Sequence, residues 1–237
     1  IGLQSESFGT VKLGKNSSSY KGVGSELDLF PDHTASVESG FGVLNSRIKN
    51  SIKYDTPSFG GLTASVTYGT ERPTQGMADY DSKANIYSTG VNYQVNNNIK
   101  AGVAYERAND LNSSQDYQYG IKAASSYTFD NNAMLGAGWE RVVYNSNGDS
   151  YGIDFRSKRD AITLSGLYPV SNFDIKGNYT HVFDTHDRYG KLHDSGANIY
   201  TAGVDYNLSK RTKVGGYYSY IDNDKGAGFN FSNNSVD

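Results

Sequence analysis

Apolar and polar residues alternate in segment after segment of this chain, and this pattern constrains the fold more than any other feature. In residues 87–95, Tyr, Thr, Val, Tyr and Val occupy every second position, with Ser, Gly, Asn and Gln between them. A period of two is typical of a β-strand whose two faces meet different surroundings. The pattern recurs over residues 62–68, 99–106, 121–129, 135–140, 162–168, 173–180, 200–208 and 213–220. We expect an all-β fold with about eleven or twelve strands.

The connections between these segments alternate in length. Short connections at residues 96–98, 130–132 and 171–172 contrast with long ones at residues 107–116 and 145–158. This order predicts an antiparallel up-and-down sheet with short turns at one end and long loops at the other. Transmembrane β-barrels have this asymmetry, and strands of about ten residues suit a tilted membrane span. We therefore expect a transmembrane antiparallel β-barrel.

Composition agrees with a membrane barrel. Mean hydropathy is −0.61, but averages do not detect barrel strands, because lipid-facing and lumen-facing residues cancel. One strand face carries Ser, Thr, Asn and Lys, and the other carries Tyr, Ala, Val and Gly. A soluble sandwich would instead bury Leu, Ile and Val, which leaves a large soluble barrel or propeller as the alternative. The net charge of −3 gives no basic footprint for nucleic acid, so no nucleic-acid partner is expected.

One stretch, residues 15–50, has no steady period. It lies between two short alternating segments at residues 8–13 and 51–54. A structureless loop of roughly 35 residues is unusual in a compact domain. In a wide barrel, however, such a loop can fold inward and narrow the lumen. We therefore expect a single barrel domain over residues 1–237, with residues 15–50 as its constriction loop.

Four stretches resemble the Gram-negative general porins, especially the neisserial and β-proteobacterial branch. They are FGTVKLGK at residues 8–15, NSIKYDTPSFGGL at 50–62, GVDYNLSKRT at 203–212 and YSYIDND at 218–224. The resemblance implies a sixteen-stranded, homotrimeric barrel in the outer-membrane lipid of a Gram-negative bacterium. It implies passive diffusion of ions and small hydrophilic solutes, with no cofactor, and an inward third loop that corresponds to residues 15–50.

The resemblance also implies opening strands before Ile1 and a closing strand after Asp237. Unpaired strand edges are not tolerated in lipid. We therefore expect that this chain by itself would not form a sealed pore.

The family's constriction sets acidic residues of the inward loop against basic residues of the facing wall, and the resulting field acts on permeating ions. By this resemblance the constriction residues are Lys15, Glu26, Asp28, Asp32, Glu38, Arg47 and Lys53. Lysines on the polar strand faces are candidates for lining the lumen: Lys12, Lys100, Lys122, Lys176 and Lys213. Lys15 stands where the family usually has Arg, and a compact ammonium cannot form the planar stacks of a guanidinium.

Two other functions are open. An outer-membrane barrel enzyme would need a Ser or Asp with a His in fixed geometry. The string GDSYG at residues 148–152 has the Gly-x-Ser-x-Gly spacing, but it lies in a long connection and not in a strand-to-helix turn, so no catalytic residues are expected. A structural or adhesive barrel would fill its interior with bulky side chains, whereas the many small inward residues favour an open lumen. The four histidines, His33, His181, His186 and His193, lack a metal-ligand pattern, so no metal site is expected.

Overall fold

The computed structural model describes residues 1–31, 44, 47–71, 83–112, 115–146 and 155–231. These residues form one antiparallel sheet in which each main strand pairs with the next strand along the chain. The main strands are β1 (Gly2–Ser5), β2 (Gly9–Ser17), β3 (Arg47–Asp55), β4 (Leu62–Glu71), β5 (Lys83–Gln94), β6 (Ile99–Asn112), β7 (Gln115–Thr128), β8 (Met134–Ser146), β9 (Phe155–Val170), β10 (Phe173–Val182), β13 (Ala197–Ser209) and β14 (Thr212–Asn223). The predicted all-β, up-and-down order is confirmed.

Three short strands were not expected from the sequence. β11 (His186–Asp187) and β12 (Gly190–Lys191) form a small hairpin between β10 and β13, and β11 also pairs with β9. β1 has four residues and pairs antiparallel with β2. Elements of this length contain too few residues to show a period of two.

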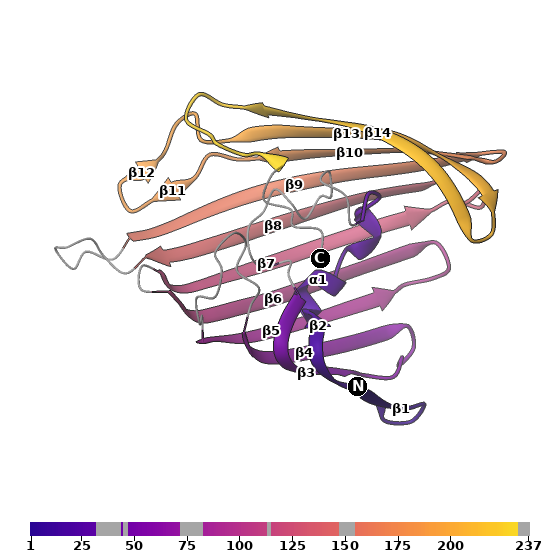
Figure 1. The fold of residues 1–237 in the computed structure, drawn as a ribbon, viewed down its shortest axis with the longest axis horizontal. Helices are drawn as coiled ribbons and strands as arrows, with labels where there is room; N and C mark the ends of the chain where they lie inside the picture. The colour runs from indigo at the N-terminus through magenta and orange to yellow at the C-terminus, as the bar shows by residue number, and fades with distance from the viewer. Residues whose placement is uncertain (32–43, 45–46, 72–82, 113–114, 147–154, 232–237) are drawn as a thin grey trace.

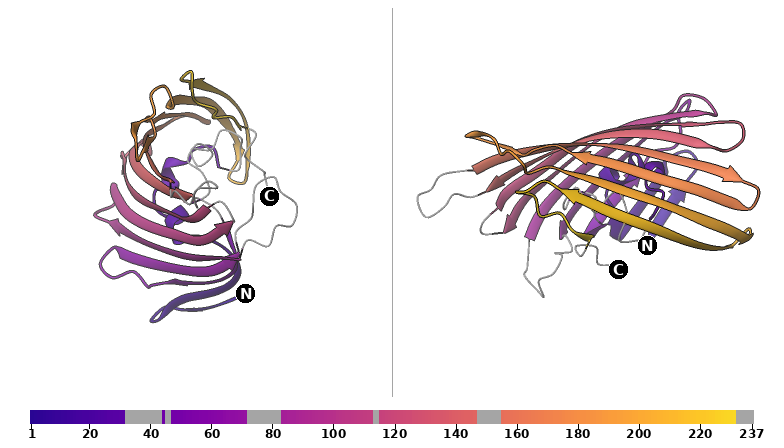
Figure 2. Two further views of the ribbon diagram at one scale, coloured as in Figure 1. Left: turned by 90° about the vertical axis from the view of Figure 1, so that its left-hand side faces the viewer. Right: turned by 90° about the horizontal axis from the view of Figure 1, so that it is seen from above.

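The sheet is strongly curved, and short turns gather at one end while longer connections gather at the other (Figure 1). Viewed along the long axis, the strands form a curved wall around a concave side (Figure 2, left). The strand order begins with β1 and ends with β14. No helix in the described part of the chain is both long and apolar enough to cross a membrane.

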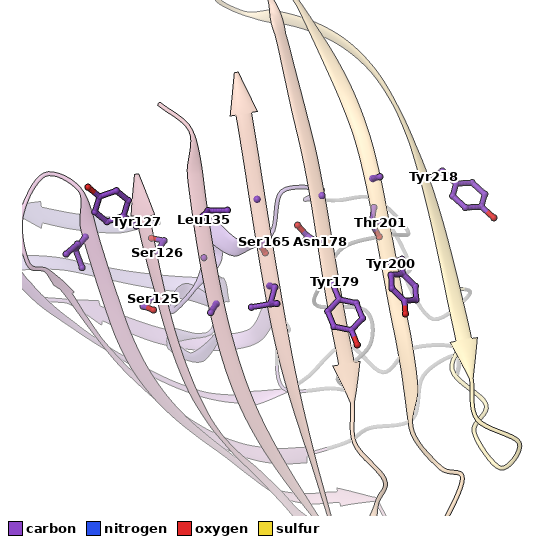
Figure 3. Close-up of a pocket in the computed structure, with 17 residues that line it drawn as sticks. Ser125, Ser126, Tyr127, Leu135, Ser165, Asn178, Tyr179, Tyr200, Thr201 and Tyr218 are labelled. Carbon is purple, nitrogen blue, oxygen red and sulfur yellow. The ribbon is translucent and has the colours of Figure 1, made fainter. Parts of the chain in front are cut away.

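The convex face of the wall is apolar and aromatic. Figure 3 looks onto this face, from which the rings of Tyr127, Tyr179 and Tyr200 project. Leu135 and Leu164 are also exposed here. Small residues between these side chains leave a shallow apolar depression; they include Ser125, Ala137, Gly166, Gly177 and Ala202. Such a surface suits lipid hydrocarbon, as in the outward band of transmembrane barrels.

The concave face of the wall is polar, as the alternation predicts. Its inward residues include Thr67, Ser88, Thr163, Asn178 and Thr201, and all of these are buried. They are buried because other parts of the chain lie against this face.

The described start of the connection between β2 and β3, residues 18–31, lies on the concave side (Figure 2, left). It contains the short helix α1 (Ser19–Gly22) and the 3-10 helix η1 (Ser25–Leu27). β2 continues to Ser17 and β3 begins at Arg47. The connection therefore covers residues 18–46 rather than 15–50, because both strands extend beyond their clearly alternating parts.

A second segment, after β14, also lies against the concave face. Phe229 and Ile199 both pack against the buried cluster of Ala161 and Val182. The guanidinium of Arg159 lies 4.9 Å from the centre of the Phe229 ring. Nothing in the sequence pattern after β14 distinguishes an inward from an outward segment.

Candidate pore constriction

Hydrogen bonds attach the start of the β2–β3 connection to strands β4 and β5. Ser19 Oγ lies 2.9 Å from Thr67 Oγ1 of β4, and the Tyr20 N–H donates to Ser88 Oγ of β5 at 2.8 Å. All four residues are buried. Because buried polar groups are costly when unpaired, these bonds fix where the connection meets the wall.

Further along, the connection is attached to strands β9 and β10. The Leu27 carbonyl accepts hydrogen bonds from Ser165 Oγ at 2.7 Å and from Asn178 Nδ2 at 3.2 Å. The Leu29 carbonyl accepts one from Lys176 Nζ at 2.9 Å. Residues 19–29 therefore cross the concave face from β4 to β10.

Apolar packing holds the middle of the connection against the wall. Four side chains of the connection pack on alanines and a valine of the strands, in a cluster of Tyr20, Val23, Leu27, Leu44, Ala104, Ala124 and Val142. Fully burying a side chain such as Val or Leu contributes about 1.5–3 kcal/mol. The cluster therefore provides much of the free energy that keeps this segment on the wall.

Glycines on the wall make this close contact possible. A Cβ added at Gly90 would lie 2.7 Å from the Ser19 carbonyl oxygen, and one at Gly102 would lie 3.0 Å from Val23. A Cβ at Gly136 would overlap Leu27. We call Gly90, Gly102, Gly120, Gly136, Gly138 and Gly203 the glycine row, since each faces a residue of the connection. These small inward residues therefore leave room for the connection to pack closely on the wall. From the sequence alone, they favoured an open lumen.

Tyr20 is fully buried where the connection meets β7 and β8. Its hydroxyl donates to Glu140 Oε1 of β8 at 2.6 Å. Lys122 of β7 donates to the Tyr20 carbonyl at 3.3 Å, and its ammonium lies 4.5 Å from the ring centre. Burial, followed by the charges of Glu140 and Glu106, raises the pKa of Tyr20 well above its usual range. Tyr20 is therefore neutral and donates the hydrogen bond.

Two of the predicted acidic residues lie in the described part of the connection. Glu26 forms an ion pair with Lys100 of β6 at 3.0 Å and accepts a hydrogen bond from Ser126 of β7 at 3.4 Å. Asp28 is half-buried, and its Oδ1 accepts a hydrogen bond from the backbone N–H of Phe30 at 3.4 Å. The other two, Asp32 and Glu38, lie outside the described residues.

Of the predicted basic residues near the constriction, Lys53 lies on the concave face. Its ammonium is 3.6 Å from Asp55 and donates to the Ser17 carbonyl at 3.3 Å. Lys12 joins the same cluster through an ion pair with Asp55 at 2.9 Å. Lys15 in β2 and Arg47 in β3 are exposed. The structure therefore brings Lys12 and Lys53 together with Asp55.

Two of the remaining predicted lysines, Lys176 and Lys213, lie on the concave face beyond the apolar cluster. Lys176 pairs with Asp205 at 2.8 Å, and Lys213 pairs with Asp174 at 2.8 Å. Phe30 lies beside them, with its ring centre 4.7 Å from the Lys176 ammonium. These residues border a cavity of about 560 Å³. Lys100, Lys122, Lys176 and Lys213 all contact a residue of the connection or an inward carboxylate.

Comparison with known proteins gives the family. The model of the Gram-negative porin family matches residues 1–226. The chain belongs to this family. An outer membrane porin protein of Bordetella pertussis is 26% identical over 94% of this porin and 66% of the relative. The porin therefore spans about two thirds of the length of that relative, and its location is the outer membrane of a Gram-negative bacterium, as predicted.

Solved structures agree with the porin fold. The anion-selective porin from Comamonas acidovorans has a TM-score of 0.69 and 24% identity, covering 94% of this porin and 66% of that chain. The trimer form of OmpT from Vibrio cholerae has a TM-score of 0.64 and 15% identity, covering 92% and 70%. The predicted transmembrane barrel class is confirmed.

Sequence reasoning missed the residues that position the connection in this porin. Tyr20, Glu106 and Glu140 belong to a buried polar cluster, and Asp174 and Asp205 pair with Lys213 and Lys176. A signal was present for four of them. Glu106, Glu140, Asp174 and Asp205 occupy inward positions of alternating segments, where a carboxylate needs a buried partner or water. No such signal marked Tyr20, because the connection has no period.

The predicted histidines are dispersed in this porin. His181 Nδ1 lies 2.9 Å from Asn198 Oδ1, His186 belongs to β11, and His193 is exposed. His33 lies outside the described residues. The described residues contain no group of three or more His, Cys, Asp or Glu side chains that could hold a metal ion.

Proposed function

We propose that the full-length porin forms a water-filled channel for passive diffusion of ions and small hydrophilic solutes. The β2–β3 connection would form its constriction. The observation that carries this proposal is the continuous series of contacts from Ser19 on β4 to Phe30 beside β14. A segment fixed across the concave face of a curved wall reduces the cross-section of the lumen. Membership of the porin family favours a channel over a barrel enzyme or an adhesin.

We further propose that the constriction carries a transverse field. Glu26 and Asp28 supply negative charge on the connection, and Asp32 and Glu38 would add to it by their position in the sequence. Lys53, with Lys15 and Arg47 at the ends of the flanking strands, supplies positive charge. Fixed charges of opposite sign across a narrow opening act on every permeating ion.

The charges of the described wall are nearly balanced. Carboxylates face the inward lysines in the pairs Lys12–Asp55, Lys100–Glu26, Lys176–Asp205 and Lys213–Asp174. One similar structure is described as anion-selective. Because of the paired carboxylates, we propose that this porin has weaker selectivity than an anion-selective channel.

We propose a homotrimer as the assembled state. A solved relative of the same fold has a trimer form. The apolar convex face supports this proposal, since a trimer in lipid needs an outward surface that suits both hydrocarbon and a neighbouring protomer.

Single-channel recording in a planar bilayer under a salt gradient tests these proposals together. We expect stepwise openings in groups of three and a small reversal potential. Protein that inserts stably without conductance would overturn the channel. Single, ungrouped openings would overturn the trimer alone, and a large reversal potential would overturn the balance of charge.

A further inference from the structure

Four charged side chains gather on the concave face near the short-turn ends of three strands. Asp174 and Lys176 belong to β10, Asp205 belongs to β13, and Lys213 belongs to β14. All four border the cavity of about 560 Å³ beside Phe30. Small-molecule sites in proteins have volumes of about 300–1,000 Å³, so this cavity has room for a solute of amino-acid size.

Strand register gives these charges a fixed order along the wall. Asp174 pairs directly with Asp205 across β10 and β13. Two carboxylates directly opposite each other repel. Lys176 offsets this repulsion by binding Asp205 at 2.8 Å, and Lys213 does so by binding Asp174 at 2.8 Å. This part of the wall is therefore neutral as a whole but strongly charged at each position.

Lys213 is the most accessible of the four charges. Its side chain is 57% exposed, against 12% for Lys176, 13% for Asp174 and 22% for Asp205. A lysine ammonium group has three N–H donors, so Lys213 can bind a second carboxylate while it keeps Asp174. It is therefore the wall residue that the carboxylate of a solute would reach.

The β2–β3 connection contributes a charge of the opposite sign. Asp28 borders the same cavity and is half-buried. With Asp28, the residues that line the cavity include three carboxylates and two ammonium groups. The cavity therefore disfavours a simple anion, and Asp28 offers a place for the ammonium group of a solute.

Aromatic rings form another side of the cavity. The ring centres of Phe30 and Tyr217 are 5.9 Å apart, with an angle of 53° between the ring planes. Phe30 is buried, whereas Tyr217 is 41% exposed. Aromatic pairs at separations of 4.5–7 Å attract each other beyond their burial of area. The exposed ring of Tyr217 therefore offers a contact for a further ring.

Two glycines preserve the shape of the cavity. A Cβ added at Gly203 would lie 2.7 Å from Cε1 of Phe30, and one at Gly215 would overlap the Asp205 carboxylate. Across β13 and β14, Gly203 pairs with Tyr217 and Asp205 pairs with Gly215. Larger side chains at these two positions would displace the ring and the carboxylate that line the cavity.

We propose that this cavity is a binding site for a zwitterionic solute with an aromatic side chain, such as an aromatic amino acid. The carboxylate of the solute binds Lys213, its ammonium group binds Asp28, and its ring packs on Tyr217. The proposal rests on the proposed channel function only for the route by which the solute reaches the cavity.

Saturation-transfer NMR of L-phenylalanine with the full-length porin in lipid nanodiscs tests this proposal, with the signal of empty nanodiscs subtracted. Three probes at neutral pH separate the contacts. Phenylacetate lacks the ammonium group, 2-phenylethylamine lacks the carboxylate, and L-alanine lacks the ring. We expect affinity to fall about fivefold without either charge and about tenfold without the ring. Equal affinity of L-phenylalanine and any one of these probes would overturn the proposal.

Lys213→Gln tests the carboxylate contact. It should weaken the binding of L-phenylalanine about fivefold and should not weaken that of 2-phenylethylamine, which has no carboxylate. Lys12→Gln is the matched control, because Lys12 is also an exposed lysine paired with an aspartate, at 2.9 Å. The affinity of this control should stay within about twofold. Equal losses in the two variants would assign the effect to charge in the lumen generally and overturn the site.

Tyr217→Leu tests the ring contact. It should weaken the binding of L-phenylalanine about tenfold and leave that of L-alanine within about twofold. Tyr218→Leu is the matched control, since Tyr218 is the next residue, 72% exposed on the convex face (Figure 3). If both variants lost L-phenylalanine to the same extent, the cavity would not be the site of binding.

The NMR measurement does not depend on conductance, so it separates this site from the channel. Binding of L-phenylalanine by protein that inserts without conductance would support the site and overturn the channel. Conductance without detectable binding of L-phenylalanine would overturn the site and leave the channel intact.

Discussion

The β2–β3 connection meets the wall in two different ways. Residues 19–27 press apolar side chains onto the glycines and alanines of β5–β8 and leave little space. Residues 28–31 lie beside two ion pairs of β10, β13 and β14, next to a cavity of about 560 Å³. The first region is a packed core, and the second is a charged surface that retains room for water.

This difference suggests that one region fixes the position of the connection and the other sets the ion selectivity of the proposed channel. Packing forces act over a few tenths of an ångström, so residues 19–27 fix where the connection lies and, in the proposed channel, would set how wide the opening is. Charges act over about 8–10 Å at physiological salt, so in the proposed channel the ion pairs near residues 28–31 would influence passing ions without fixing the backbone. Substitutions in the first region should change stability and conductance, and those in the second should change selectivity.

The largest effect is expected from Leu27→Ala. Leu27 is 5% exposed and belongs to the apolar cluster. Truncating a buried Leu costs about 2–5 kcal/mol through lost contacts and the cavity that remains. Urea unfolding from detergent micelles would measure this loss. Leu29→Ala is the matched control in the second region, where the side chain is half-buried. An equal loss for both would show that the two regions do not differ.

The next largest effect is expected from Gly90→Ala. The added methyl group would lie 2.7 Å from the Ser19 carbonyl oxygen, so the backbone of the connection has to move. Overpacking of this kind costs about 1–3 kcal/mol. The chain has no cysteine, so a single spin label at Ser25→Cys would report the motion of η1 alone, and it should become more mobile.

Gly166→Ala provides the control for the glycine row. Gly166 belongs to β9, and an added Cβ would have its nearest neighbour at 3.5 Å, which is ordinary contact. The spin label should not respond to this change. A label that becomes equally mobile in both variants would mean that strand weakening, not the connection, causes the effect.

The two regions also differ in how much of them the sequence could predict. The strands, their order and the inward lysines follow from a period of two, because each strand face meets one kind of surrounding. Lys100, Lys122, Lys176 and Lys213 therefore lie on the predicted face. Asp205 and Asp174, the carboxylate partners of Lys176 and Lys213, occupy the same inward face, so the period of two could have predicted them as well.

The packed region could not be predicted in the same way. The contacts of Tyr20 join residues more than a hundred positions apart, such as Tyr20 and Glu140. The connection has no period, so nothing fixed which of its side chains faced the wall. The glycine row was visible as inward glycines on successive strands, but small residues suit an open lumen as well as a close contact. Only the path of the connection shows that these glycines serve a close contact and not an open lumen.

A smaller effect is expected from alkaline pH through Tyr20. Its pKa is raised in the folded protein by burial and by Glu140. When the connection leaves the wall, the pKa returns to its ordinary value of about 10. The contribution of Tyr20 is therefore complete below about pH 10 and is lost as the pH rises toward the folded value.

Spin-label mobility at Ser25→Cys between pH 8 and pH 11.5 would measure this change. We expect mobility to rise above about pH 10. Tyr20→Phe, which has no proton to lose, should be more mobile at pH 8 because the Glu140 carboxylate loses a buried partner. A pH dependence that persists in Tyr20→Phe would assign it to another group.

The smallest effect on stability, and the clearest on selectivity, is expected from Lys213→Gln in the charged region. Lys213 pairs with Asp174, but its side chain is 57% exposed, and exposed pairs contribute at most about 1 kcal/mol. The free energy of unfolding should change by less than about 0.5 kcal/mol. The lumen loses one fixed positive charge while Asp174 remains, so the reversal potential should shift toward cations. Screening shortens the range of charge to about 3 Å at 1 M salt, so the shift should disappear there. A shift that persists at 1 M salt would instead show a change in the width of the opening, and the division between packed and charged regions would fail.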